Sequence, residues 1–159
     1  MAKAIGVDVL NLSRGNMVSA ANKFEVPPID LPHGFNIPMA SRVRRETGMI
    51  TIGVGRINDP YFAEKVLEDD LVDMVAMSRA QLADPELMNK IRDGRINEID
   101  RCCGCNEGCL DGFANLDMPH ITCLRNPAVG REAECVITPS DNPRTVLVAG
   151  GGMAGMMAA

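Results

Sequence analysis

Four cysteines between residues 102 and 123 carry the strongest chemical pattern in the sequence. Cys102, Cys105, Cys109 and Cys123 are spaced C-x2-C-x3-C-x13-C in a glycine-rich stretch. Thiolates this close in sequence can converge on one metal centre, because short loops cost little closure entropy and glycines let the backbone wrap around it. Structural zinc sites usually consist of two separated C-x2-C pairs, so a tight triplet followed by a fourth thiol favours an iron–sulfur cluster.

The other cysteines and the two histidines are weaker candidates. Cys103 is adjacent to a predicted ligand, so we expect its side chain to point away and to remain a free thiol, like Cys135. His120 could replace one thiolate, but the fourth cysteine makes that unnecessary. His33 follows a run of prolines and is interpreted as a loop residue. A small non-catalytic zinc-binding interaction module remains the alternative interpretation.

A glycine motif near the end of the sequence is the second chemical pattern. The stretch TVLVAGGGMAG places G-x-G-x-x-G on Gly150, Gly152 and Gly155, after an expected apolar strand at 145–149 and before a helix start rich in small residues. Such glycines let the backbone approach a pyrophosphate at the positive end of a helix dipole. The motif therefore predicts nucleotide binding, and a tight strand-to-helix turn is the alternative.

An alternation of strands and helices must position these residues. We expect buried strands at 7–12, 49–54 and 72–77, helices at 37–47, from Pro60 to about Asp69 and from Asp84, and a long loop at 17–34. This rhythm implies parallel strands joined by crossover helices. The pattern is typical of either a doubly wound sheet or part of a (β/α)8 barrel.

The turns after the second and third expected strands each contain an arginine, Arg56 and Arg79. In a (β/α)8 barrel the loops after the last strands commonly form a phosphate site, and an arginine with exposed backbone amides suits a flavin phosphate. Ion pairs between these arginines and neighbouring acids are the alternative.

Composition narrows the classes of function. The formal net charge of −5 argues against a nucleic-acid partner, which needs a concentrated basic face. The sequence contains no run of eighteen apolar residues, which a membrane-spanning helix would need, and no signal-peptide pattern follows Met1. A cytoplasmic protein is expected, in which six cysteines favour metal binding over disulfides.

Six motifs, in this order along the chain, resemble the NADH:flavin oxidoreductases of the Old Yellow Enzyme class, which include 2,4-dienoyl-CoA reductase, 2-enoate reductase and bile-acid-inducible reductases. They are PPIDLPHG (27–34), GRINDP (55–60), VDMVAMSRAQLADPEL (72–87), CCGCNEGCLD (102–111), CLRNPAVGRE (123–132) and VLVAGGGMAG (146–155). The resemblance implies an α/β fold in four parts. These are the C-terminal part of an FMN-binding TIM barrel (1–100), an iron–sulfur loop (101–130), a linker (131–143) and the start of a Rossmann-like FAD/NAD(P)-binding domain (144–159).

The resemblance also implies roles for individual residues. Cys102, Cys105, Cys109 and Cys123 would hold a [4Fe-4S] cluster. The expected FMN contacts are Gly55, Arg56, Ser78 and Arg79, and the expected FAD cradle is Gly150, Gly151, Gly152, Met153, Ala154 and Gly155.

The function implied by the resemblance is electron transfer from NAD(P)H through FAD and the cluster to FMN. The substrate would be a small molecule with an activated C=C bond, such as an enoate, an enoyl-CoA or a steroid-type compound. Two features of the dienoyl reductases are absent: the first half of the barrel with its proton-donor tyrosine, and a partnering histidine in the 16–26 region. No catalytic residue is therefore assigned. We expect the chain to be a segment of a longer enzyme, inactive alone, and assembly of that enzyme into a homo-oligomer is compatible with this interpretation.

Overall fold

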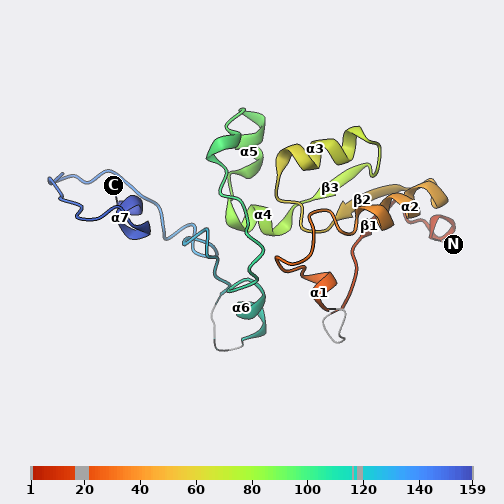
Figure 1. The fold of residues 1–159 in the computed structure, drawn as a ribbon, viewed down its shortest axis with the longest axis horizontal. Helices are drawn as coiled ribbons and strands as arrows, with labels where there is room; N and C mark the ends of the chain where they lie inside the picture. Colours follow the sequence, from red (N-terminus) through yellow and green to blue (C-terminus); the bar gives the residue numbers. More distant parts are fainter. Residues whose placement is uncertain (1, 17–21, 116, 118–119, 159) are drawn as a thin grey trace.

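Three short strands form one parallel sheet in a computed structural model that describes residues 2–16, 22–115, 117 and 120–158. The strands are β1 (Val9–Leu12), β2 (Ile50–Val54) and β3 (Met74–Ala76), hydrogen-bonded in the order β1-β2-β3 (Figure 1). Val9 pairs with Ile50, and Ile52 pairs with Met74, both in parallel register. The expected parallel arrangement is confirmed.

Helices connect and follow the strands. They are η1 (Lys3–Ile5), α1 (Asn22–Glu25), α2 (Ile37–Thr47), α3 (Pro60–Glu68), α4 (Ser78–Ala83), α5 (Leu87–Arg92), η2 (Ile96–Glu98), α6 (Leu110–Ala114) and α7 (Met153–Ala158). Helix α2 has its predicted bounds, because Gly48 adopts φ 60° and ends the helix with a hydrogen bond to the Arg44 carbonyl. Helix α3 starts where Asp59 accepts a hydrogen bond from the Tyr61 N–H and Pro60 takes the first position.

The core lies where α2 and α3 pack against the sheet. Ile37 and Ala40 of α2, Val66 of α3 and Val72 before β3 belong to one buried apolar cluster. Gly53 in β2 permits the close approach, since a Cβ there would lie 2.7 Å from the Ile37 side chain. The opposite sheet face, by contrast, is more open and exposes apolar side chains of all three strands: Val9, Ile50 and Met74.

Several elements differ from the expectations. Residues 78–83 form helix α4 rather than a turn, and α5 begins at Leu87 because the Asp84 side chain first accepts the Glu86 N–H in a short turn. Short helices also occur in the 17–34 loop and in the cysteine loop, namely α1 and α6; residues 17–21 of the first loop lie outside the described part of the chain.

The prediction of a strand at 145–149 is wrong. Val146 and Leu147 are 76% and 91% exposed, and this stretch has no regular structure. A strand needs a hydrogen-bonded neighbour, and none pairs with this stretch within the described residues. The expected linker at 131–143 also has no helix or strand, and Figure 1 shows the chain leading away from the sheet there towards α7. No described helix combines the length and apolar character needed to cross a membrane.

Candidate functional site

A cavity of about 210 Å³ lies at the carboxyl ends of the three strands. Its walls are the residues that follow β1, β2 and β3 together with the segment from α1 to Pro27. All four residues predicted to contact FMN line it: Gly55, Arg56, Ser78 and Arg79. The parallel sheet explains this convergence, because the carboxyl ends of neighbouring parallel strands open on the same edge.

Arg56 forms part of the cavity wall and also holds a loop in place. Its Nη1 donates to the carbonyl of Ile29 at 2.9 Å and to that of Leu31. Its Nε is buried without a hydrogen-bond partner in the described structure and lies 2.9 Å from where a Cβ on Gly104 would stand. The Arg56 guanidinium therefore connects the proline-rich loop to the cysteine loop.

Arg79 lies between the cavity and a second, smaller pocket and lines both. Its Nη2 donates to the Pro27 carbonyl at 2.8 Å, and its Nη1 donates to the Asn106 side chain. Among the described residues neither Arg56 nor Arg79 forms an ion pair with an acid. The partners of both guanidinium groups are neutral, so their positive charges are not cancelled within this part of the chain.

The second pocket is lined by thiols. All four predicted cluster ligands contribute to it: Cys102, Cys105, Cys109 and Cys123. Cys103 lines it as well, although we expected its side chain to point away. Within the described residues no three His, Cys, Asp or Glu side chains are arranged as a metal-ligand group.

The donor set nevertheless fits a soft metal centre, since five cysteines line the pocket, together with one carboxylate, that of Glu107. Burial raises the pKa of the Cys105 and Cys109 thiols; the positive charge of Arg79 opposes this rise at Cys109. A bound cation would favour both thiolates and would release protons from them.

Backbone contacts bring the fourth cysteine back to the first three. The Thr122 N–H donates to the Gly108 carbonyl at 3.1 Å, which places Cys123 beside the turn that carries Cys109. Gly108 has φ 74°, and a Cβ there would overlap Thr122, so only glycine fits. The Asn58 side chain, which follows β2, donates to the Cys102 carbonyl and ties the first cysteine to the sheet.

The glycine motif forms a turn into α7. Gly150 has φ 131°, a backbone conformation that residues with a side chain rarely adopt, and a Cβ on Gly155 would overlap the Gly150 carbonyl. Backbone conformation therefore favours glycine at 150, and close packing requires it at 155. A Cβ on Gly151 or Gly152 would meet no atom within 4 Å. The open space on these two residues fits a backbone cradle for an external group.

Sequence reasoning missed several residues of the site. Asn106 joins the two pockets through its side chain, and the Asn36 side chain donates to the Leu12 carbonyl at 2.8 Å at the cavity wall. The pattern that could have indicated Asn106 is its place directly after Cys105 in a turn, because asparagine tolerates a left-handed backbone. Neither histidine lines the cavity or the thiol pocket.

Comparisons with known proteins agree with this geometry. Residues 1–98 match the model of the NADH:flavin oxidoreductase / NADH oxidase family. An NADH oxidase of Thermoanaerobacter brockii is 38% identical over 162 residues, which covers 100% of this chain and 24% of the relative. A cinnamate reductase of Clostridium sporogenes is 33% identical over 156 residues, covering 98% of this chain and 23% of the relative.

A solved structure of a 2-naphthoyl-CoA reductase bound to 2-naphthoyl-CoA superposes with a TM-score of 0.82 at 26% identity, over 98% of this chain and 23% of that one. The chain thus spans about a quarter of the length of the proteins it matches. The α/β fold, with its parallel sheet, is consistent with a TIM-barrel flavin oxidoreductase. The chain belongs to the NADH:flavin oxidoreductase / NADH oxidase family.

Proposed function

We propose that this chain forms the junction between the FMN site and an iron–sulfur site in an NAD(P)H-dependent ene-reductase. In this proposal electrons pass from NAD(P)H through FAD and a [4Fe-4S] cluster to FMN, at which an activated C=C bond is reduced. The single observation that supports it most is the wall that the two pockets share: Arg79 and Cys102 line both. Two redox groups in these pockets would be direct neighbours.

The residues of the chain have distinct tasks in this proposal. Arg79 binds the flavin phosphate with charge-assisted hydrogen bonds, and Arg56 keeps the proline-rich loop in place at the cavity wall. Gly55 and Ser78 complete the phosphate end of the cavity. Cys102, Cys105, Cys109 and Cys123 hold the cluster, and Cys103 and Cys135 stay unligated.

The division of the chain follows from the same assignment. Residues 1–100 are the C-terminal part of the FMN barrel, 101–130 the cluster loop and 131–143 a linker. Residues 144–159 begin the FAD/NAD(P)-binding domain, with Gly150 to Gly155 at the pyrophosphate. The exposed apolar side chains of Val9, Ile50 and Met74 lie on the sheet face opposite the helices and fit the interior of a barrel, where side chains of further strands of the whole enzyme would cover them.

The substrate class rests on the relatives, whose names include a cinnamate reductase and a 2-naphthoyl-CoA reductase. Both names indicate an unsaturated ring or chain conjugated to a carboxyl or thioester carbonyl. We therefore propose a small unsaturated carbonyl compound as the substrate of the full-length enzyme. A cytoplasmic location stays a prediction.

Kinetics of the full-length enzyme, measured anaerobically and again in the presence of O2, test this function. Purified enzyme should release both FMN and FAD on extraction, and it should oxidise NADH only slowly until cinnamate is added as an electron acceptor. Cinnamate-dependent oxidation of NADH with formation of the saturated acid supports the proposal. If the enzyme contains no FMN, or contains zinc in place of iron, the proposed function is overturned; oxidation that depends on O2 but not on any unsaturated acid overturns the substrate class alone.

A further inference from the structure

Asn106 connects three segments that are far apart in the sequence. Its Nδ2 donates to the Val26 carbonyl at 2.9 Å, and its Oδ1 accepts a hydrogen bond from Arg79 Nη1. Arg79 Nη2 in turn donates to the Pro27 carbonyl at 2.8 Å. The cysteine loop, the 26–27 segment and the start of α4 are thus closed into one hydrogen-bonded triangle, which is partly buried.

The backbone of Asn106 explains why this residue type stands here. Its φ is 63°, a left-handed conformation that glycine and asparagine adopt more readily than other residues. Its carbonyl accepts hydrogen bonds from Leu110 at 3.1 Å and Asp111 at 3.4 Å, so it starts the helical turn that carries Cys109. Asparagine combines tolerance of this backbone with an acceptor oxygen and a donor NH2 group in one short side chain.

The position of the Arg79 guanidinium therefore depends on the cysteine loop. One Nη group is held by a neutral amide oxygen and the other by a backbone carbonyl, and neither partner cancels the charge. The side chain lines the cavity on one side and the thiol pocket on the other. A neutral acceptor orients the guanidinium group and leaves its positive charge available to a phosphate, whereas a carboxylate would neutralise that charge.

Building on the proposed function, we propose that Asn106 is a positioning residue for Arg79, which makes phosphate binding in the cavity depend on the conformation of the cysteine loop. Asn106 lines the thiol pocket but not the cavity, so in this proposal it acts on the phosphate only through Arg79. Loss of its side chain leaves Arg79 with one fixed donor, so the guanidinium loses its orientation towards the phosphate. The same loss lets the positive charge of Arg79 move away from the thiol pocket, which would lower the midpoint potential of a cluster held there.

The test compares two flavins on the deflavinated full-length enzyme. Asn106→Gly keeps the left-handed backbone and deletes only the side chain. We expect it to weaken FMN binding by about tenfold, the range for a charge-assisted hydrogen bond, and to leave riboflavin binding unchanged because riboflavin has no phosphate. Asp70→Gly is the matched control: Asp70 also has a left-handed backbone, at φ 53°, but it precedes β3, whereas the cavity lies where β3 ends, and it pairs with Arg44. It should change neither affinity.

A double-variant cycle distinguishes positioning from a direct contact. Arg79→Ala alone should weaken FMN binding at least as much as Asn106→Gly, and the double variant should be no weaker than Arg79→Ala. The midpoint potential of the iron centre should fall in Asn106→Gly with the iron content unchanged. Additive losses, equal losses for FMN and riboflavin, or an unchanged FMN affinity would each overturn the role of Asn106. If the wild-type enzyme does not prefer FMN to riboflavin, the proposed phosphate site itself fails.

Discussion

The segment from α2 to α5 and the segment from Cys102 to α7 acquire their structures in different ways. Between residues 37 and 92 the chain buries apolar side chains of two helices against a sheet, with Ala40 and Leu87 fully buried. In the described part of 101–158, Val129 is the only buried apolar side chain, and the chain after it is largely exposed. The first segment is stabilised by its own core, whereas the second is organised around thiols and glycines. Regions of the second kind gain much of their stability when a metal or cofactor binds.

Serine substitutions of the cysteines are expected to have the largest effect and test the second segment directly. In the full-length enzyme, serine at Cys102, Cys105, Cys109 or Cys123 should abolish the visible absorbance of the cluster and electron transfer from FAD to FMN, because a hydroxyl is a poor ligand for a soft centre. Serine at Cys103 or Cys135 should leave both intact. Anaerobic absorbance spectra and flavin reduction rates measure this.

Cys103 is the most demanding case in that comparison, because it lines the same pocket as the four predicted ligands. If Cys103→Ser removes the cluster and Cys102→Ser spares it, the ligand assignment is wrong by one position. Iron content of each variant, normalised to protein, decides between the two assignments.

The glycine turn contains positions with open space around them, such as Gly152, and positions that are closely packed, such as Gly155. Gly152→Val should abolish FAD binding in the full-length enzyme, because a side chain there would occupy the space a pyrophosphate needs, yet it meets no atom of the chain itself. The measurement is FAD released per polypeptide, with iron content as the internal control that the cysteine loop is intact. Retained FAD in this variant would show that the glycines serve the turn alone.

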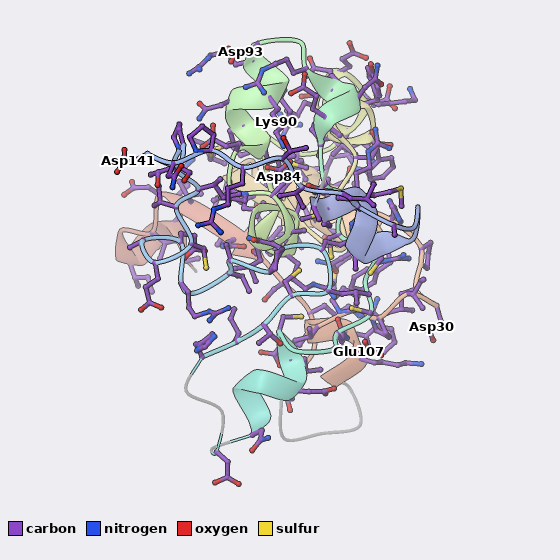
Figure 2. All side chains as sticks on the ribbon, turned by 90° about the vertical axis from the view of Figure 1, so that its left-hand side faces the viewer. Asp30, Asp84, Lys90, Asp93, Glu107 and Asp141 are labelled. Carbon is purple, nitrogen blue, oxygen red and sulfur yellow. The ribbon has the colours of Figure 1, made fainter. Side chains whose placement is uncertain are left out.

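A buried ion pair in the first segment gives the next largest effect. Lys90 Nζ lies 2.7 Å from Asp84 Oδ2, and the Asp84 side chain is only 3% exposed; Figure 2 shows the two side chains together. Burial of Asp84 opposes its ionisation, but hydrogen bonds from Lys90 and from the Asp100 and Glu86 amides outweigh it and lower its pKa. Lys90→Met should destabilise α5 by about 3 kcal/mol, because it leaves a buried carboxylate without its cation.

The matched control is Lys65→Met in α3, where Lys65 pairs with Asp69 at 3.0 Å but both side chains are largely exposed. It should cost less than about 1 kcal/mol. Amide hydrogen exchange in the full-length enzyme measures both losses of stability, that of α5 in Lys90→Met and that of α3 in Lys65→Met. If the exchange rates of the two helices rise equally, the buried ion pair does not stabilise α5 as proposed.

The smallest effect concerns pH. The Arg44 side chain donates to Asp73 at 3.0 Å and the Thr51 N–H donates to it at 2.8 Å, and these bonds lower the pKa of Asp73 from 3.8 to about 2. The ionised Asp73 carboxylate therefore contributes fully to the free energy of unfolding above its unfolded-state pKa, and this contribution is lost as pH falls from about 4 towards 2. Asp73→Asn should remove this acid dependence from the amide exchange of β2. An unchanged pH profile would show that Asp73 contributes nothing there.

The elements of the first segment were predictable because their determinants are local. The period of apolar residues, Gly48 at the end of α2 and Pro60 at the start of α3 indicate the bounds within a residue or two. Helix α4 was missed because Ser78 and Arg79 look like turn residues, and the helix is fixed by burial of Ala80 and Ala83 against neighbouring segments. Helix propensity alone does not indicate this burial.

The site was only partly predictable. The spacing of the cysteines indicates four ligands and the two arginines indicate an anion site, since residue type and position in a turn carry those predictions. The link between the two pockets was not visible, because it depends on hydrogen bonds that join Asn106 to Val26, 80 positions away in the chain, and to Arg79, 27 positions away. Cys103 lines the same pocket as the four predicted ligands, because a strict alternation of neighbouring side chains does not hold in a loop where Gly104 has φ 75°.

Metal and sulfide analysis of the purified full-length enzyme tests the central claim most directly. If this chain holds a [4Fe-4S] cluster between an FMN site and an FAD site, the brown protein should contain about four iron atoms and about four acid-labile sulfides per polypeptide. Serine at Cys123 should remove all of them and leave FMN bound. A colourless protein with one zinc atom and no sulfide would contradict the electron relay.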